Sequence, residues 1–275
     1  MNAIVSETEC DSLSAQIDPA QWTAIIPAAG HGSRLGFGQP KILFPLLGRP
    51  ILDWVLDALR PSCRRFVFIL SPSGQEPVSP VIRERLGAAG EVVIQENPTG
   101  MGDAVLCAQS VVRTPYSLVV WGDQITLSQR TVQRCASLHQ AQPGAALTLP
   151  TILKRQPYIH FVRGPNERII EVLQARERPI LHDVGESDCG LFLFTTTILF
   201  HTLNRARREG IGLGATTREF NLLQALPEFE LCPGAIRTLR ISDYNETLGV
   251  NTPEDAKNAE AVLRQRALIS NSARS

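Results

Sequence analysis

Four glycines and two basic residues lie within the fourteen residues from 28 to 41, AAGHGSRLGFGQPK. Glycines let successive backbone amides converge on one point, and such a nest binds an anion without the help of a side chain. Arg34 can grip a phosphate through two parallel hydrogen bonds, whereas Lys41 supplies a compact point charge. The segment therefore predicts a polyphosphate-binding loop. Its glycines are Gly30, Gly32, Gly36 and Gly38.

Two common glycine-rich loops do not fit this segment. The dinucleotide-binding fingerprint needs a G-x-G-x-x-G string, but Leu35 stands where the third glycine should be. The P-loop string G-x-x-x-x-G-K-[ST] does not occur in the chain. A different kind of triphosphate site is therefore expected.

The string A-A-G-x-G-[ST]-R-[LM], followed by a Pro-Lys pair, resembles the signature of nucleotidyltransferases that activate sugar phosphates. The similarity is greatest to the N-terminal uridyltransferase domain of bifunctional N-acetylglucosamine-1-phosphate uridyltransferases. It covers residues 22–265 and does not extend to their hexapeptide-repeat acetyltransferase half. The resemblance implies an enzyme with the nucleotide-diphospho-sugar transferase fold, also called GT-A. The loop residues that it implies in nucleotide binding are Ala28, Ala29, Gly30, Gly32 and Ser33.

The resemblance also implies one catalytic Mg²⁺ ion, held by Asp123 in LVVWGDQ and by Asn251 in GVNTPED, with Gly122 in the adjoining nucleotide site. Mg²⁺ prefers oxygen ligands and is usually held by one or two protein groups together with substrate phosphates. Asp123 follows a strand-like run, and ligands bind at the carboxyl ends of strands in open α/β sheets. Two structural roles stay open: Asp123 as a helix cap, and Asn251 as part of the entry to a helix.

The segment QENPTGMGDA, residues 95–104, resembles the part of this family that reads the base. Gln95 matches the glutamine that recognises uracil, because its amide offers both a donor and an acceptor. Gly100 would let the backbone approach the base. Met101 stands where the family carries a threonine, so CTP stays open beside UTP. Gln95 could also be an ordinary polar residue at the end of a strand.

The expected acceptor site departs from the family pattern. The family uses a glycine in a Y-G-R-I strand, a glutamate in the next strand and an asparagine in an N-T-G turn, and this chain has Ile159, Gln174 and Asp188 there. A branched side chain at position 159 fills the space that glycine leaves for a sugar. We therefore expect another sugar 1-phosphate, a cyclitol phosphate or a phosphonate in place of N-acetylglucosamine 1-phosphate. The predicted acceptor-binding residues are Tyr158, Gln174 and Asp188.

The elements that must position these residues follow from the apolar pattern. Helical spacing is found after Pro50 and over residues 103–113 and 127–139, between runs typical of buried strands. This alternation predicts an α/β fold with a Rossmann-like, mainly parallel sheet flanked by helices. In the second half, a hairpin around GPNE suggests a small β-rich acceptor-binding portion. The strand-like runs of the first half are residues 23–27, 65–70, 91–95, 116–121 and 145–150.

Composition limits the classes of partner. The chain has 275 residues and a formal net charge of +0, so no overall field attracts it to nucleic acid or to a membrane surface. It has neither a membrane-spanning apolar run nor a secretory signal pattern, and its six cysteines are scattered, which predicts a cytoplasmic protein with reduced thiols. We expect one nucleotidyltransferase domain at residues 21–265, between flexible tails at residues 1–20 and 266–275. The oligomeric state stays open, with a homo-oligomer among the alternatives.

The implied reaction is an in-line attack by an acceptor phosphate or phosphonate oxygen on the α-phosphorus of an NTP, with loss of pyrophosphate. The enzyme must bring two polyanions together and neutralise the growing charge, and the expected catalytic residues are Arg34 and Lys41. Three alternatives stay open. One is a cytidylyltransferase that acts on a phosphonate, polyol or choline-like phosphate. The others are a glycosyltransferase, whose usual D-x-D motif WGDQI lacks, and a non-catalytic nucleotide-binding regulator.

Overall fold

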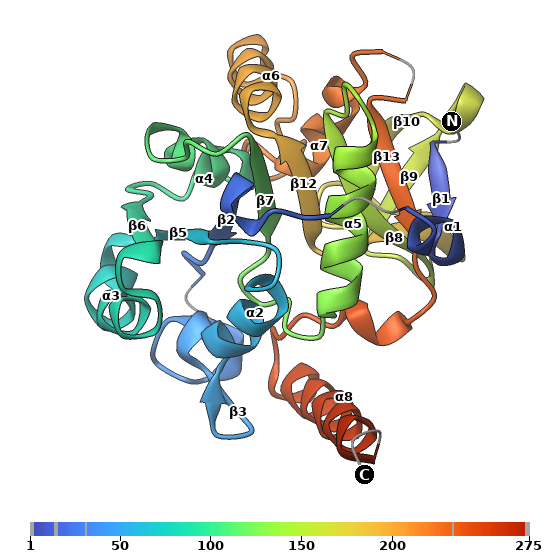
Figure 1. The fold of residues 1–275 in the computed structure, drawn as a ribbon. Coiled ribbons are helices and arrows are strands. Elements are labelled where there is room, and N and C mark those ends of the chain that lie inside the picture. The colour runs from blue at the N-terminus through green and yellow to red at the C-terminus, as the bar shows by residue number, and fades with distance from the viewer. Residues whose placement is uncertain (1–2, 14–15, 31, 233, 273–275) are drawn as a thin grey trace.

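The computed structural model describes residues 3–13, 16–30, 32–232 and 234–272. Within them, a nine-stranded sheet forms the centre of the molecule (Figure 1). Its strands are β1 (Ile4–Ser6), β2 (Trp22–Pro27), β5 (Arg65–Leu70), β6 (Gly90–Ile94), β7 (Tyr116–Val120), β8 (Leu147–Arg155), β11 (Val184–Asp188), β12 (Leu191–Thr195) and β13 (Ile236–Arg240). They are ordered β1-β13-β8-β12-β7-β2-β5-β6, and β11 pairs with β8.

Most neighbouring strands run parallel, which confirms the predicted sheet type. The antiparallel pairs all involve β11 or β12. Strands β2, β7, β8 and β13 therefore all point the same way, and their carboxyl ends lie along one edge of the sheet. In sheets of this kind, ligands bind at that edge.

Helices cover both faces of the sheet, because its strands bury side chains on both sides. In β2, Ala24 and Ile26 join one hydrophobic core and Ile25 joins the other. The first core takes side chains from α1 (Glu7–Asp11), α2 (Ile51–Leu59), α3 (Pro72–Leu86), α5 (Gln129–Ala141) and α8 (Pro253–Ser272). The second takes them from α4 (Met101–Cys107), α6 (Thr196–Glu209) and α7 (Leu222–Ala225).

Two small antiparallel sheets complete the fold. The predicted hairpin around GPNE is present, with β9 (Ile159–Arg163) paired to β10 (Ile169–Gln174). Its apolar side chains, such as Phe161 and Val172, pack into the second core. The other small sheet pairs β3 (Pro45–Leu46) with β4 (Arg49–Pro50), just after the glycine loop.

The five strand-like runs of the first half all form strands, although β8 begins at Leu147 and continues to Arg155. Helix α3 was not expected, because it contains Pro77 and Pro80. It is capped by the Ser71 hydroxyl, which accepts from the Gly74 backbone amide, and its inner face is buried through residues such as Val78.

The N-terminal segment differs from the flexible tail expected for residues 1–20. Strand β1 pairs in parallel with β13 over Ile4–Ser6 and so extends the central sheet. Ser6 then begins α1 with a reciprocal capping box to Glu9. The sequence did not predict this strand because a three-residue run shows too little alternation to be recognised.

Ion pairs hold α1 to the domain, and packing holds the first half of α8. Arg134 of α5 binds Glu7 and Asp11 of α1. At the other end, α8 continues to Ser272, beyond the expected boundary at 265, and it extends away from the body of the molecule (Figure 1). Its first half packs through Ala256 and Ala259.

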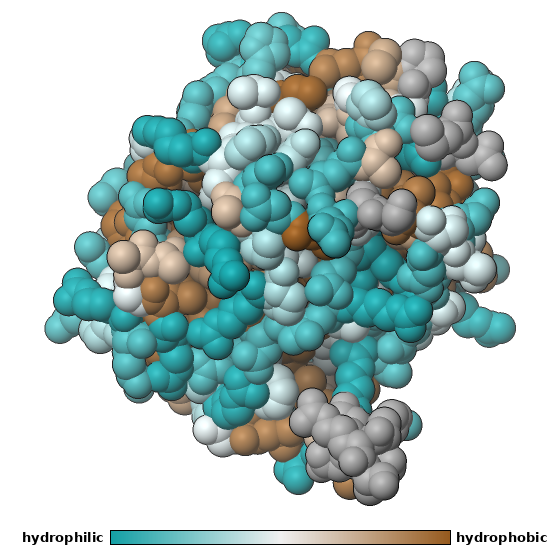
Figure 2. Space-filling view, in the orientation of Figure 1, coloured by the Kyte–Doolittle hydropathy of each residue, from teal (hydrophilic) through white to brown (hydrophobic). Residues whose placement is uncertain are grey.

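On the face in Figure 2, hydrophilic residues predominate and hydrophobic residues form small, separate areas. Among the described residues, no helix combines the length and the apolar character needed to cross a membrane.

Candidate active site

The glycine loop after β2 folds closely around Lys41. Gly32 has a left-handed φ of 63°, and a Cβ atom there would come within 3.0 Å of the Lys41 Cβ. The Lys41 backbone amide donates to the Gly30 carbonyl at 3.3 Å. A side chain at position 32 would therefore be both strained and crowded. The glycines allow Lys41 to lie beside the carboxyl end of β2.

The remaining loop residues run from the buried strand to the surface. Ala28 is buried, and its amide donates to the Ile69 carbonyl at 2.8 Å, which continues the pairing of β2 with β5. Ala29 is half-buried, and Gly30, Ser33 and Arg34 are exposed. The loop thus presents exposed backbone and one guanidinium group to solvent.

Four predicted residues from three distant segments meet at this loop. The Lys41 Nζ donates to the Asp123 Oδ2 at 2.5 Å and to the Asn251 Oδ1 at 3.0 Å. The Arg34 Nη2 donates to the same Asn251 oxygen at 3.3 Å, across 217 residues of sequence. The side chains of Lys41 and Asp123 are 18% and 16% exposed, so water reaches this pair only in part. We call these four residues the cation cluster.

Asp123 is placed by a tight turn against β2. A Cβ atom on the buried Gly122 would lie 2.8 Å from the Pro27 carbonyl oxygen, so only glycine lets the two loops touch. The Asp123 carbonyl accepts from the Val250 amide at 3.2 Å. Helix α5 is capped by Ser128 and not by Asp123, which removes the alternative role as a helix cap. The Asp123 carboxylate is therefore available to the cation cluster.

Asn251 divides its two functions between backbone and side chain. Its backbone amide donates to the Asp255 Oδ2 at 3.0 Å, and Thr252 completes a capping box with the same aspartate. The backbone of Asn251 does therefore shape the entry to α8. This leaves the amide side chain in the cation cluster.

Gln95 and Gly100 are bonded to one another. The Gln95 side chain is buried, and its Nε2 donates to the Gly100 carbonyl at 3.1 Å. Gly100 has a φ of 122°, and a Cβ atom there would lie 2.3 Å from the Phe220 carbonyl oxygen. Phe220 also donates to Thr99 and accepts from Gly102 through its backbone. The glycine is thus required by the packing of Phe220, a partner that the sequence did not reveal.

The three predicted acceptor residues do not form one bonded group. Gln174 is buried, and its Oε1 accepts from the Asn221 Nδ2 at 2.5 Å. Tyr158 is 56% exposed, and its carbonyl accepts from Ala175, next to Gln174. Among the described residues, no hydrogen bond joins Asp188 to either of them.

Asp188 lies at the end of β11. Its Oδ2 accepts from the Gly190 amide at 2.8 Å, and desolvation raises the pKa of this carboxyl group. Ile159 is buried in the second core and pairs with Gln174 across the hairpin. The branched side chain therefore takes the place of the family's glycine in a packed position.

Lys154 is a residue near this site that sequence reasoning missed. It lies half-buried at the carboxyl end of β8, with its Nζ 5.4 Å from the centre of the Tyr244 ring. Desolvation lowers the pKa of its ammonium group, and within the described part of the chain no carboxylate lies within 4 Å of it. A single lysine in TILKRQ belongs to no motif, so only the strand direction reveals that it lies at the ligand-binding edge.

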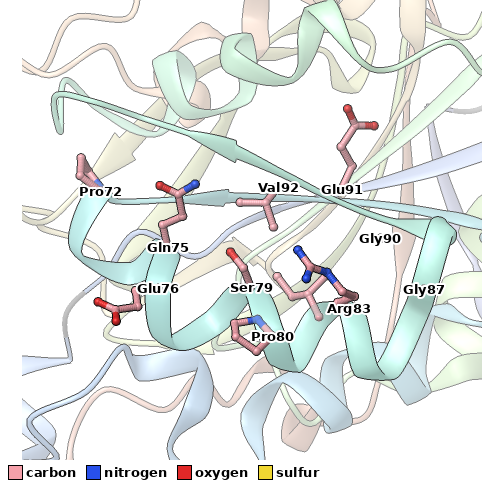
Figure 3. A pocket seen from close by; sticks show the side chains of 11 residues that line it. Pro72, Gln75, Glu76, Ser79, Pro80, Arg83, Gly87, Gly90, Glu91 and Val92 are labelled. Atoms are coloured by element: carbon pink, nitrogen blue, oxygen red, sulfur yellow. The ribbon is translucent and has the colours of Figure 1, made fainter.

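A separate groove of about 600 Å³ lies between α3 and β6, at the edge of the sheet (Figure 3). It contains none of the predicted site residues. Its polar lining includes Gln75, Glu76, Ser79 and Arg83 from α3 and Glu91 from β6.

The cation cluster fits a magnesium site in its donor chemistry. One carboxylate oxygen and one amide oxygen already contact a cation, the Lys41 ammonium group. Mg²⁺ accepts such a sparse protein donor set when substrate phosphates and water supply the other ligands. The described residues contain no group of three or more His, Cys, Asp and Glu side chains that could hold a metal ion on its own. Asp123 and Asn251 would hold such an ion, and substrate phosphates and water would supply its other ligands.

Several known proteins have sequences similar to this chain. Residues 24–187 match a family model described as the MobA-like NTP transferase domain. The bifunctional protein GlmU of Pelobacter propionicus is 28% identical over 250 residues, which cover 88% of this chain and 52% of that protein. GlmU of Thermus thermophilus is 30% identical over 250 residues, with the same two shares. The chain thus spans about half the length of the curated relatives it matches.

A solved structure shows the same fold. The inositol-1-phosphate CTP transferase from T. maritima superposes with a TM-score of 0.68 and 15% identity, over 90% of this chain and 97% of that one. The resemblance expected from the sequence is confirmed, as is the α/β fold class. Because the family model covers more than half of the sequence, the chain is a nucleotidyltransferase that belongs to the family of MobA-like NTP transferase domains.

Proposed function

We propose that this enzyme is a Mg²⁺-dependent nucleotidyltransferase that joins an NTP to a phosphorylated small molecule and releases pyrophosphate. UTP is the favoured nucleotide, and a sugar 1-phosphate or a related phosphate is the favoured acceptor. The observation that carries this proposal is the convergence of Arg34, Lys41, Asp123 and Asn251 at the carboxyl edge of the sheet. Two cations and two oxygen ligands in one place suit the transfer of a phosphoryl-linked group.

The chemistry needs charge neutralisation more than proton transfer. An acceptor phosphate oxygen is already anionic, so no general base has to create the nucleophile. The exposed loop amides and Arg34 would hold the triphosphate, and Lys41 would lie against the α-phosphate, where negative charge grows. Asp123 and Asn251 would hold Mg²⁺, which supplies charge stabilisation at the phosphate oxygens when it is bound.

The choice of base rests on Gln95. The Gly100 carbonyl can only accept, so the side-chain amide of Gln95 must turn its Nε2 towards it. The Gln95 Oε1 then remains as an acceptor, and the second hydrogen on Nε2 remains as a donor. That pair matches the imide and carbonyl groups of uracil. Cytosine can also donate its amino group to Oε1, so CTP is the alternative. One similar structure is named a CTP transferase, whereas the curated relatives are named GlmU.

The acceptor side supports a phosphorylated ligand other than N-acetylglucosamine 1-phosphate. Ile159, where the family has a glycine, is buried, and Gln174 is already engaged by Asn221, which supports a different acceptor. Lys154, which has no ion-pair partner among the described residues, offers a positive charge at the same edge. A phosphonate, polyol or choline-like phosphate used with CTP is therefore the second candidate reaction.

We also propose a cytoplasmic location. All six cysteines are free thiols, four of them buried, and such thiols persist in reducing compartments. Nucleic acid is not a proposed partner, because the chain has no net charge to attract it.

The decisive experiment measures pyrophosphate release for each of the four NTPs against a library of sugar phosphates, cyclitol phosphates and phosphonates. The proposal expects Mg²⁺-dependent release with UTP, or with CTP as the alternative, and with one acceptor class, and no release in EDTA. The Asp123→Ala variant provides the blank. Nucleotide binding without turnover on the whole panel would contradict the proposal and would support a non-catalytic regulator.

A further inference from the structure

The Lys41 ammonium group lies between the two side chains proposed to bind the metal. It is 2.5 Å from the Asp123 Oδ2 and 3.0 Å from the Asn251 Oδ1. Both oxygens are therefore engaged with a cation in this structure. Arg34 adds a second positive group at the same Asn251 oxygen.

A divalent cation and this ammonium group compete for the same oxygens. Mg²⁺ needs oxygen ligands at about 2.0–2.1 Å in a near-octahedral arrangement. An ion at that distance from the Asp123 Oδ2 would lie within about 5 Å of Nζ, where two positive charges in a partly shielded site repel strongly. The ammonium group must therefore leave before the metal can bind well.

The loop lets Lys41 leave without moving its backbone. The Lys41 amide is held by the Gly30 carbonyl, and Gly32 packs against its Cβ. Beyond Cβ, three methylene groups carry the ammonium group, and rotation about their bonds can move it, because the lysine stem is flexible. The exposed amides of the loop lie next to it, so a triphosphate bound there would draw the ammonium group off Asp123.

We propose that Lys41 is a resident cation that blocks the Asp123–Asn251 metal site until an NTP binds and attracts the Lys41 side chain to its phosphates. This inference rests on the proposed function, since it requires the same loop to bind a triphosphate. It adds an order of binding: the nucleotide binds first and opens the metal site, and the metal ion alone binds weakly. The enzyme would thereby keep Asp123 and Asn251 from binding a metal ion until a nucleotide is present.

The first test measures Mn²⁺ binding without nucleotide, by electron paramagnetic resonance. We expect Lys41→Met to bind Mn²⁺ at least about tenfold more tightly than the wild-type protein, because the competing charge is gone. The matched control is Lys154→Met, which removes the same charge at the same edge without touching either oxygen. It should bind Mn²⁺ like the wild type. In the double variant Lys41→Met, Asp123→Asn, the gained binding should be lost.

The second test measures UTP binding by calorimetry in EDTA, which removes any effect that acts through a bound metal ion. Asp123→Asn frees Lys41 and should tighten metal-free UTP binding several-fold. Part of that gain reflects lower repulsion of the triphosphate, so the same substitution is repeated in the Lys41→Met background. The gain should be clearly smaller there, since a double-mutant cycle isolates the contribution that acts through Lys41.

Equal Mn²⁺ affinities of the wild type and Lys41→Met would overturn the proposal, as would equal UTP gains in the two backgrounds. Failure of Lys41→Met to bind Mn²⁺ at all would overturn it too. These results are independent of turnover. A protein that shows the Mn²⁺ difference but releases no pyrophosphate on any substrate would retain the resident cation and lose the proposed function.

Discussion

The regions proposed to bind the nucleotide and the acceptor are built differently. On the nucleotide side, glycines at positions 32 and 122 bring backbones together, and the charged side chains meet in the cation cluster. On the acceptor side, the corresponding residues are buried or already bonded, as Ile159 and Gln174 are. In the proposed function, the first region receives the triphosphate, and the second excludes the family's usual sugar.

This difference indicates which part of the enzyme is general and which is particular. Triphosphates are alike, so a loop of amides and two cations serves any NTP. Acceptors vary in shape, and the shape of the site that must fit them is set by side-chain packing. The change from glycine to Ile159 alters packing within the core, not charge at the surface. The predictions below test this division, beginning with the largest expected effect.

Asp123→Ala should reduce turnover by at least about a thousandfold, because it removes the one carboxylate of the cation cluster and leaves Lys41 without its partner. Pyrophosphate release at saturating Mg²⁺ measures it. Thermal unfolding should show that the variant is folded. Activity near that of the wild type would place the metal elsewhere and would end the contrast between the two sides.

Lys41→Ala should reduce turnover by roughly two to three orders of magnitude, the scale for the loss of one preorganised charge-stabilising group. Lys257→Ala, an exposed lysine on α8, is the matched control and should leave turnover unchanged. A raised KM with kcat unchanged would limit Lys41 to binding of the substrate in the ground state.

Ile159→Ala should lower the free energy of unfolding by about 2–4 kcal/mol, the range for truncating a buried isoleucine. The affinity for UTP should stay the same, because the hairpin contributes nothing to the glycine loop. Urea denaturation and calorimetry measure the two quantities, with the milder Ile159→Val as control. New turnover with N-acetylglucosamine 1-phosphate would sharpen the comparison, whereas a change in UTP affinity would break it.

The free energy of unfolding should fall in mild acid, because of His139 on α5. Burial lowers the pKa of His139 to about 3, while the unfolded chain titrates near 6.5. The unfolded state therefore binds a proton first, so this contribution to stability is full above pH 6.5 and is lost as pH falls towards 3. Between pH 6.5 and 5 the loss should be about 2 kcal/mol.

His139→Gln tests this origin, because glutamine can still bond to Thr148 but does not titrate. Urea denaturation at several pH values should show a flatter pH dependence in the variant. An equal slope in both proteins would assign the acid sensitivity to other groups.

The parts of the fold that were predictable have local causes. Buried strands show as apolar runs, and the loop is visible because glycine and charge occur together at a strand end. Lys41, Asp123 and Asn251 were identified from a resemblance, and their meeting follows from the carboxyl ends of parallel strands. The sequence could not show that Lys41 lies on the metal ligands, because that depends on three segments.

The unpredicted parts depend on contacts between residues far apart. Gly100 is explained by Phe220, and Gln174 is bonded to Asn221, partners at 120 and 47 residues' distance that carry no shared motif. Helix α3 forms despite two prolines, because its buried face outweighs their poor propensity. The pairing of β1 with β13 joins two segments that are far apart in the sequence, which no local pattern reveals.

A crystal structure with UTP and Mg²⁺ tests the central claim most directly. The account predicts the triphosphate against the loop at Gly30, Gly32 and Ser33, the ion on Asp123 and Asn251, and Lys41 turned from Asp123 to the phosphates. Nucleotide in the groove between α3 and β6, or an ion away from Asp123 with the Lys41–Asp123 pair intact, would contradict it.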